Sequence, residues 1–267
     1  MEPEYYKGAD AAVYEQVHGD IFNPIEQQRL RGMLRQAVES VQTGTRPLKA
    51  LDFGCGSGNL TRHLIELAVY TVSADLSDDF LKGIWRKFSG SNLSDTLKLN
   101  GRDLSNVPNA HFDLVATYSV LHHVPDYLAI VREMCRVVKP GGVLYIDHEV
   151  TETYYEKPAV YMEFLQKALP CVNWRRWLSL VFDVRGYVHI LRRLCNPRYK
   201  REGDIHVWPD DRVEWDKIEQ ILAAEGFEIV RKQDYLLYKA IYDLQVYNEY
   251  KDRCTDERVL IARRRKQ

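Results

Sequence analysis

The sequence lacks the cysteine spacing of a disulfide framework or a zinc cluster. Its five cysteines are odd in number, and no two of them form a Cys-x-x-Cys pair. Even sets of regularly spaced cysteines are typical of disulfide-rich domains, and Cys-x-x-Cys pairs are typical of zinc sites. The sequence therefore predicts no metal site and favours a reducing compartment.

Targeting signals and long apolar runs are absent as well. The chain begins Met-Glu-Pro-Glu-Tyr-Tyr, without the basic and apolar segments of a signal peptide. No stretch approaches the roughly 18 uninterrupted apolar residues of a membrane span. From these absences we expect a cytoplasmic globular protein.

An excess of charge of either sign is also missing. The 37 basic and 38 acidic residues give a net charge of -1. Nucleic-acid-binding domains usually carry a strongly basic surface, so we expect no nucleic-acid partner. At 267 residues the chain is long enough for one large domain or for a domain with an insertion.

The sequence does contain a regular alternation of strand-like and helix-like segments. Short apolar runs over 48–53, 70–74, 96–99, 112–118 and 143–147 are separated by helical patterns over 60–68, 79–88 and 127–138. A further helix near 215–222 precedes strand-like runs at 227–230 and 258–262. This alternation predicts an α/β fold, with a parallel sheet that helices cover on both faces.

Two segments do not follow the alternation. Residues 1–42 form a helical lead-in, and residues 151–208 form a largely helical insertion after the fifth strand. We expect this insertion to be a lid. The core then consists of residues 43–150 and 209–267.

A glycine-rich turn stands between the first strand and the following helix. Residues 52–58 read Asp-Phe-Gly-Cys-Gly-Ser-Gly. Glycine lets a ligand approach bare backbone, and the start of a helix offers unpaired N–H groups. Asn59 stands where a dinucleotide-binding fingerprint needs its third glycine, and no P-loop Gly-Lys-Ser/Thr follows. The alternative is an ordinary structural turn.

With this loop the sequence resembles the class I S-adenosylmethionine-dependent methyltransferase superfamily, of the small-molecule type. Residues 112–126 and 136–144 resemble the family's fourth-strand and fifth-strand motifs, in the expected order. The resemblance implies a Rossmann-like, seven-stranded, mostly parallel sheet with a final antiparallel strand. It also implies S-adenosyl-L-methionine as the cofactor.

The resemblance carries over residue by residue to the cofactor site. Asp52 would face the methionine ammonium, and Asp75 would accept hydrogen bonds from the ribose diol, although an Asp there can also cap the next helix. Asp103 would lie near the adenine amino group. The ring of Tyr14 would meet the sulfonium or, alternatively, pack against a helix. The other expected cofactor contacts are Gly54, Cys55, Gly56, Gly58, Asn59, Leu76, Leu104 and Ser119.

The fourth-strand motif also excludes some relatives. Methyltransferases that act on exocyclic base amines would carry Asn/Asp-Pro-Pro-Tyr/Phe here, whereas residues 118–121 read Tyr-Ser-Val-Leu. No Pro-Cys supplies the nucleophile for cytosine C5 methylation. The resemblance therefore favours a small-molecule acceptor, methylated at oxygen or nitrogen.

Methylation of a hydroxyl requires a general base, for which imidazole has a suitable pKa. His148, at the end of the fifth strand, is the first candidate because ligands of open α/β sheets bind at that edge. His123 is the second candidate and His206 the third. Each of these histidines can instead serve only in packing or capping.

We expect the insertion to determine which acceptor binds. Between residues 174 and 201 its only acid is Asp183, amid arginines that include Arg175, Arg176 and Arg193. Such a lid suits an anionic or amphiphilic acceptor, or contact with an acidic membrane surface. The alternative is a packed helix with solvated arginines. The sequence predicts neither the acceptor nor the oligomeric state. Rival functions are a non-catalytic cofactor-binding scaffold and an NAD-linked dehydrogenase.

Overall fold

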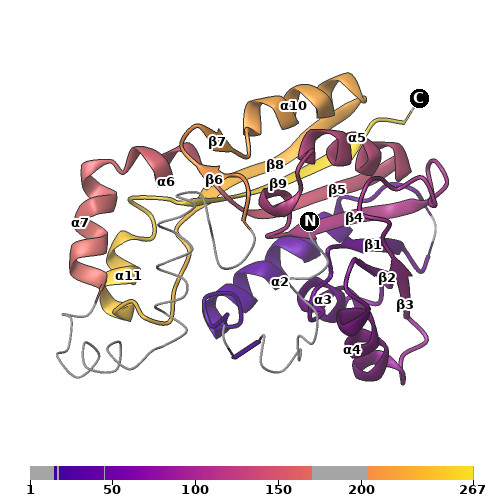
Figure 1. Ribbon diagram of the computed structural model, residues 1–267, viewed down its shortest axis with the longest axis horizontal. Coiled ribbons are helices and arrows are strands. Elements are labelled where there is room, and N and C mark those ends of the chain that lie inside the picture. Colours follow the sequence, from indigo (N-terminus) through magenta and orange to yellow (C-terminus); the bar gives the residue numbers. More distant parts are fainter. Residues whose placement is uncertain (1–14, 17, 45, 170–203, 267) are drawn as a thin grey trace, which may run out of the picture.

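The computed structural model describes residues 15–16, 18–44, 46–169 and 204–266 (Figure 1). Tyr14 and the lid arginines Arg175, Arg176 and Arg193 lie outside these described residues. The contact of Tyr14 with the sulfonium and the contact of the arginines with the acceptor therefore stay predictions.

A seven-stranded sheet runs through the described part of the chain, in the order β3-β2-β1-β4-β5-β9-β8. Strand β9 pairs antiparallel with both of its neighbours, and the β1, β2, β3, β4 and β5 pairings are parallel. This arrangement confirms the predicted mostly parallel sheet and the antiparallel strand near its end. The strands are β1 (Lys49–Phe53), β2 (Tyr70–Asp75), β3 (Ser94–Lys98), β4 (Phe112–Tyr118), β5 (Val138–Val150), β8 (Phe227–Tyr235) and β9 (Glu257–Arg264).

Helices cover both faces of the sheet (Figure 1). One face is covered by α2 (Pro24–Glu39), α3 (Asn59–Glu66) and α4 (Asp78–Phe88), and the other by α5 (Tyr127–Val137) and α10 (Trp215–Ala224). Each face buries its own apolar cluster: Leu30 and Leu34 pack on one side, and Met134 and Trp215 on the other. Alternating strand residues supply both clusters, as expected for a sheet buried on two faces.

Polar side chains fix where several helices begin. Asn23 accepts from the N–H groups of Ile25 and Glu26 at the start of α2, and Ser77 and Asp126 cap α4 and α5 in the same way. Each cap pairs N–H groups that the first helical turn leaves free. These caps set the ends of the loops that surround the carboxyl edge of the sheet.

Strand β5 is longer than the sequence predicts and contains an irregularity. Its pairing with β9 shifts register between Asp147 and Glu149, and His148 takes a positive φ of 61°. A bulge of this kind redirects side chains on either side of it. Here it lets Asp147 and Glu149, which lie two residues apart, make quite different contacts.

A smaller layer lies beyond the end of the sheet (Figure 1). Helix α7 (Ala159–Ala168), which follows the short α6 (Glu152–Glu156), packs against α11 (Leu244–Tyr250), burying Phe164 and Tyr250. The helical start of the predicted lid therefore packs with a segment between β8 and β9 that the sequence analysis assigned to the core. A two-stranded hairpin, β6 (Val207–Trp208) and β7 (Asp211–Arg212), precedes α10.

Within residues 15–16, 18–44, 46–169 and 204–266, no helix combines the length and apolar character that crossing a membrane requires.

Candidate functional site

A pocket of about 290 Å³ lies where strands β1, β2 and β4 end. The carboxyl edge of a parallel sheet is the usual ligand site of open α/β folds. Side chains and backbone from five stretches of chain converge on it. The residues that line the pocket include Ile21, Phe22, Asp52, Gly54, Cys55, Gly56, Asn59, Asp75, Leu76, Asp103, Tyr118, Ser119 and His123.

The glycine loop between β1 and α3 requires glycine at two positions for steric reasons. Gly54 and Gly58 have φ of 72° and 92°, and an added Cβ would lie 2.6 Å from Val120 Cγ2 and from Ile84 Cδ1, respectively. At Gly56 (φ 49°) an added Cβ would meet no atom within 4 Å. The loop thus packs tightly at its two ends and leaves its middle backbone open toward the pocket.

Asp52 is buried where β1 passes into the loop. Its Oδ2 accepts hydrogen bonds from the N–H (2.9 Å) and the hydroxyl (2.6 Å) of Thr61 in the first turn of α3. Burial raises the pKa of Asp52 to about 7, and the nearby Asp75 carboxylate contributes in the same direction. A cationic group bound next to this buried carboxylate would stabilise its ionised form.

Asp75 ends β2 and joins two loops. Its Oδ2 accepts from the N–H of Gly56 (3.0 Å) and its Oδ1 from the N–H of Ser77 (2.8 Å). The side chain is 8% exposed, and burial raises its pKa. Ser77, not Asp75, caps α4, and Asp75 holds the backbone of that cap residue while its carboxylate lines the pocket.

Asp103 lies on a tight turn after β3. Its Oδ1 accepts from the Asn100 side chain (2.7 Å) and from the Ser105 N–H (3.0 Å), and hydrogen bonds from Ser105 and Asn100 lower its pKa to about 2. The neighbouring Leu104 is fully buried in the core and does not line the pocket. Of this predicted pair, only Asp103 can meet a ligand directly.

The pocket brings together most of the predicted cofactor residues. Of those that the structure describes, Gly58 and Leu104 lie behind the lining. Sequence reasoning missed Ile21 and Phe22, which reach the pocket from the segment before α2. Their signal is weak, because two apolar residues before a helix N-cap resemble an ordinary hydrophobic contact.

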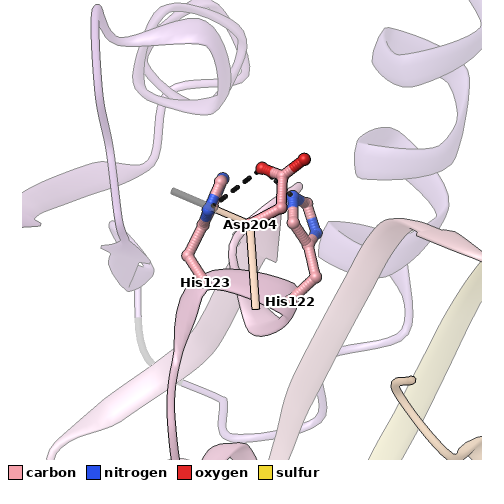
Figure 2. A group of neighbouring side chains, drawn as sticks. All are labelled: His122, His123 and Asp204. Carbon is pink, nitrogen blue, oxygen red and sulfur yellow. Dashed lines mark ion pairs between the residues drawn. The ribbon is translucent and has the colours of Figure 1, made fainter. Parts of the chain in front are cut away.

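His123 lines the pocket, and a group of polar side chains surrounds it (Figure 2). Its Nδ1 lies 3.4 Å from Oδ1 of Asp204, and the ring centroid of His122 lies 4.1 Å from its own. Glu149 holds His122 through an Nδ1–Oε2 contact of 2.8 Å. His206, the third candidate, instead contacts Asp211 and the carbonyl groups of residues 124 and 125.

His148 is not among the residues that line this pocket. Its ring stacks on Tyr118, which does line it, at a centroid distance of 4.7 Å. Both ring nitrogens are buried and find no hydrogen-bond partner in the described part of the chain. Burial, followed by the charge of Arg29, lowers the pKa of His148 well below its usual value, so the ring is neutral.

Comparison with known proteins agrees with this architecture. A family profile described as "Methyltransferase domain" matches residues 51–146. The demethylmenaquinone methyltransferase of Corynebacterium urealyticum is 30% identical over 186 residues, which cover 70% of each chain. A Rossmann-like sheet with its pocket at the carboxyl edge, together with this relative, defines the class. The chain belongs to the class I S-adenosylmethionine-dependent methyltransferase superfamily.

A second relative and a solved structure are similar to this chain as well. The ubiquinone biosynthesis O-methyltransferase of Psychrobacter cryohalolentis is 30% identical over 159 residues, covering 58% of this chain and 60% of that one. The solved S-adenosylmethionine-dependent methyltransferase from Mesorhizobium loti shares the fold, with a TM-score of 0.54, 18% identity, and coverage of 87% of this chain and 96% of that one. The chain is thus a methyltransferase whose cofactor is S-adenosyl-L-methionine, and the NAD-linked alternative falls away.

Proposed function

We propose that this methyltransferase transfers a methyl group to an oxygen of a small-molecule acceptor, a hydroxyl group on an aromatic, quinone-type ring, with nitrogen as the alternative. The names of the two curated relatives support a quinone-type acceptor, and the second name supports methylation at oxygen. One refers to a demethylmenaquinone acceptor and the other to O-methylation in ubiquinone biosynthesis. An aromatic hydroxyl is more acidic than an aliphatic one, so a neutral imidazole can accept its proton.

For the cofactor we assign the acidic residues of the pocket to its two polar ends. Asp52, buried beside the glycine loop, would pair with the methionine ammonium. Asp75 would accept the ribose hydroxyl groups with the lone pairs that Gly56 and Ser77 leave free. The open backbone at Gly56 leaves room for the ligand between them. The bound cofactor supplies an activated methyl group on its sulfonium.

The observation that carries the acceptor assignment is that a histidine lines the same pocket as these carboxylates. His123 comes from the short 3-10 turn after β4, Leu121–His123, and Asp204 holds its ring. His148 stands behind Tyr118 instead. We therefore rank His123 ahead of His148 as the residue that meets the acceptor, which reverses the order suggested by sequence position alone.

The arginine-rich insertion remains the proposed source of acceptor specificity. We propose that an anionic or amphiphilic acceptor would meet Arg175, Arg176 and Arg193. Reversal of these three residues to Glu should raise the acceptor KM without changing cofactor affinity. An unchanged KM in a folded variant would remove the anionic acceptor from the proposal.

The reaction is tested with methyl-labelled S-adenosylmethionine and a panel of small aromatic compounds. Each hydroxyl compound is paired with its methoxy analogue, and aromatic amines form a separate set. We expect label on the hydroxyl compounds and none on the methoxy analogues. Label on amines or ring carbons alone would overturn the hydroxyl assignment. Cofactor binding without label transfer to any compound would support the non-catalytic scaffold.

The two histidines are separated by their substitution variants. His123→Gln should lower kcat by about 100-fold or more, as removal of a group that takes part in proton transfer does. His148→Asn keeps a residue that tolerates a positive φ and should lower kcat by less than about tenfold. If His148→Asn lowers kcat more than His123→Gln does, His148 would again rank ahead of His123 as the residue that meets the acceptor.

A further inference from the structure

Three side chains of types that commonly bind metal ions lie together, and one of them, His123, lines the pocket. His122, His123 and Asp204 each offer one ligand atom, and these atoms lie within 4.8 Å of one another. Figure 2 shows the two imidazoles on adjacent residues, with the carboxylate of Asp204 between them. Oδ1 of Asp204 lies 3.4 Å from Nδ1 of His123 and 4.0 Å from Nε2 of His122. A nitrogen of each ring therefore lies near the same carboxylate oxygen.

The tautomer of His122 is set by its other neighbour. Glu149 accepts backbone hydrogen bonds from Val120 (3.0 Å) and Leu121 (2.7 Å) through Oε1, and its Oε2 lies 2.8 Å from His122 Nδ1. A carboxylate only accepts, so Nδ1 donates, and a neutral ring then carries its lone pair on Nε2. This carboxylate–histidine arrangement is the usual support of a metal-bound imidazole. It leaves Nε2 aimed toward Asp204.

Backbone hydrogen bonds hold the third group in place. The carbonyl oxygen of His122 accepts from the N–H of Ile205 (2.9 Å) and from the N–H of His206 (3.0 Å). These bonds fix the chain next to Asp204 against the turn that carries both histidines. The side chains of the three groups are 13–17% exposed, so they are largely shielded from water, and His123 also lines the pocket.

A simple ion pair accounts for only part of this arrangement. One protonated imidazole would satisfy Asp204. Two protonated rings with centroids 4.1 Å apart would repel each other. A cation bound by both neutral rings and by the carboxylate would instead engage all three side chains without any protonated ring. Metal–ligand distances of about 2.0–2.2 Å place ligand atoms about 3–4 Å apart, which small side-chain rotations reach from here.

We propose that His122, His123 and Asp204 bind a divalent transition-metal ion of the zinc type. Two imidazoles and one carboxylate suit Zn²⁺, Fe²⁺ or Co²⁺ better than Mg²⁺ or Ca²⁺, which prefer all-oxygen sites. Three protein ligands leave a coordination position open, as in catalytic rather than structural sites. The sequence concealed this group because Asp204 is distant from the histidines along the chain.

The location gives the metal a role that rests on the proposed function. His123 lines the pocket, so a metal held by these residues would lie beside the space in which the acceptor is proposed to bind. An acceptor hydroxyl bound there loses its proton to solvent more readily, and its oxygen keeps the electron pair. That oxygen forms the bond to the methyl carbon as the carbon–sulfur bond breaks, with its electrons passing to sulfur. In this arrangement His123 acts as a metal ligand, and the proton passes to solvent instead of to its ring.

The binding itself is tested without acceptor. The untagged full-length chain is stripped with EDTA and titrated with Zn²⁺, Co²⁺ and Mg²⁺ by calorimetry, while visible absorption reports the ligand field of Co²⁺. We expect one Zn²⁺ or Co²⁺ per chain and at least about 100-fold weaker binding of Mg²⁺. Absence of one-to-one binding by Zn²⁺ and Co²⁺, or equal affinity for Mg²⁺, would overturn the proposal.

Substitution variants test whether the metal binds at His122, His123 and Asp204. Asp204→Asn and His123→Gln should each weaken Co²⁺ binding at least about tenfold and change its visible spectrum. Glu149→Gln, which removes the support of His122, should weaken it by about 10–100-fold. His111→Gln is the matched control, because His111 contacts Lys49 at a distance from the pocket. Thermal unfolding confirms that each variant is folded. Binding that survives both Asp204→Asn and His123→Gln in folded protein would refute the site.

Cofactor affinity, measured on the same samples, separates the two proposals. If S-adenosylmethionine binds and the metals do not, the metal site falls and the proposed function stands. If the metals bind as expected but no acceptor is methylated, the acceptor assignment falls and the metal site stands.

Discussion

The carboxylate of Asp75 accepts a hydrogen bond from the backbone N–H of Gly56 at 3.0 Å. This bond ties the end of β2 to the middle of the glycine loop, where the backbone faces open space. One acidic residue therefore shapes the loop and also borders the pocket. Its two roles make it the most informative residue to change.

Asp75→Ala should weaken S-adenosylmethionine binding by about 1–3 kcal/mol, because charge-assisted hydrogen bonds to the ribose and to the loop are both lost. Calorimetry measures the change. Asp78→Ala, at an exposed position only three residues away, is the control and should leave affinity unchanged. Equal affinity of Asp75→Ala and the wild type would contradict the ribose assignment.

Cofactor affinity should depend on pH through Asp52. Its pKa is raised to about 7 in the free protein, and a neighbouring ammonium favours the ionised form, so binding should release a proton. Between about pH 6 and about pH 7.5 the ionised fraction rises roughly eightfold, and the association constant should rise with it. Asp52→Asn should abolish this rise. A wild-type affinity that is flat over this range would show that Asp52 does not face the ammonium.

The same residue has the opposite effect on the stability of the free protein. Its folded-state pKa lies above the unfolded value of about 3.9, so its contribution is fully present below about pH 4 and is lost as the pH rises through about 7. The free energy of unfolding, from denaturant titrations, should therefore fall less steeply with pH for Asp52→Asn than for the wild type. Parallel curves would contradict this.

Gly58→Ala should destabilise the fold by about 1–3 kcal/mol, since a positive φ is strained for alanine and the added Cβ would lie 2.6 Å from Ile84 Cδ1. Gly32→Ala is the matched control. Gly32 lies within α2 with no atom within 4 Å of an added Cβ, so alanine there should stabilise by about 0.5–1 kcal/mol. Denaturant midpoints measure both. A neutral Gly58→Ala would refute the packing at the loop.

Arg29→Met should be strongly destabilising because Arg29 joins two buried acids. Its guanidinium contacts Glu26 (2.5 Å) and Asp147 (2.9 Å), which are 2% and 0% exposed, and linking them fastens α2 to β5. Removal of one partner of a buried ion pair costs about 3–5 kcal/mol. Arg31→Met breaks an exposed pair with Glu66 and should cost less than about 1 kcal/mol. Similar losses for the two variants would contradict the importance of burial.

The sheet was predictable because its signals are local. Apolar runs that end at an acidic or glycine residue give β1, β2 and β4, and helix caps such as Ser77 and Asp126 mark where the next helices begin. In the described part of the chain the β6–β7 hairpin escaped, and so did the helix α11 and the lengths of β5, β8 and β9. The paired residues of these three strands are far apart in sequence, and exposed side chains in β8 weaken its apolar pattern.

The gathering of the proposed cofactor residues around one pocket was predictable for the same reason. Parallel strands end at one edge of a sheet, so residues that follow them, such as Asp52, Asp75 and Ser119, gather there whatever the details of packing. The acceptor side was less predictable. The rank of His148 and His123 depends on the bulge in β5, which leaves His148 behind Tyr118.

The sequence by itself determined the α/β fold, the glycine loop and the acids that border the pocket, because strand periodicity, helix caps and steric demands act over a few residues. Only the tertiary structure decided that Ile21 and Phe22 reach the pocket, that Glu149 supports His122, and that Asp204 meets His123. These contacts join residues that chain-local rules do not relate. They exist because the packing of the sheet, the turn after β4 and the returning chain bring the side chains together.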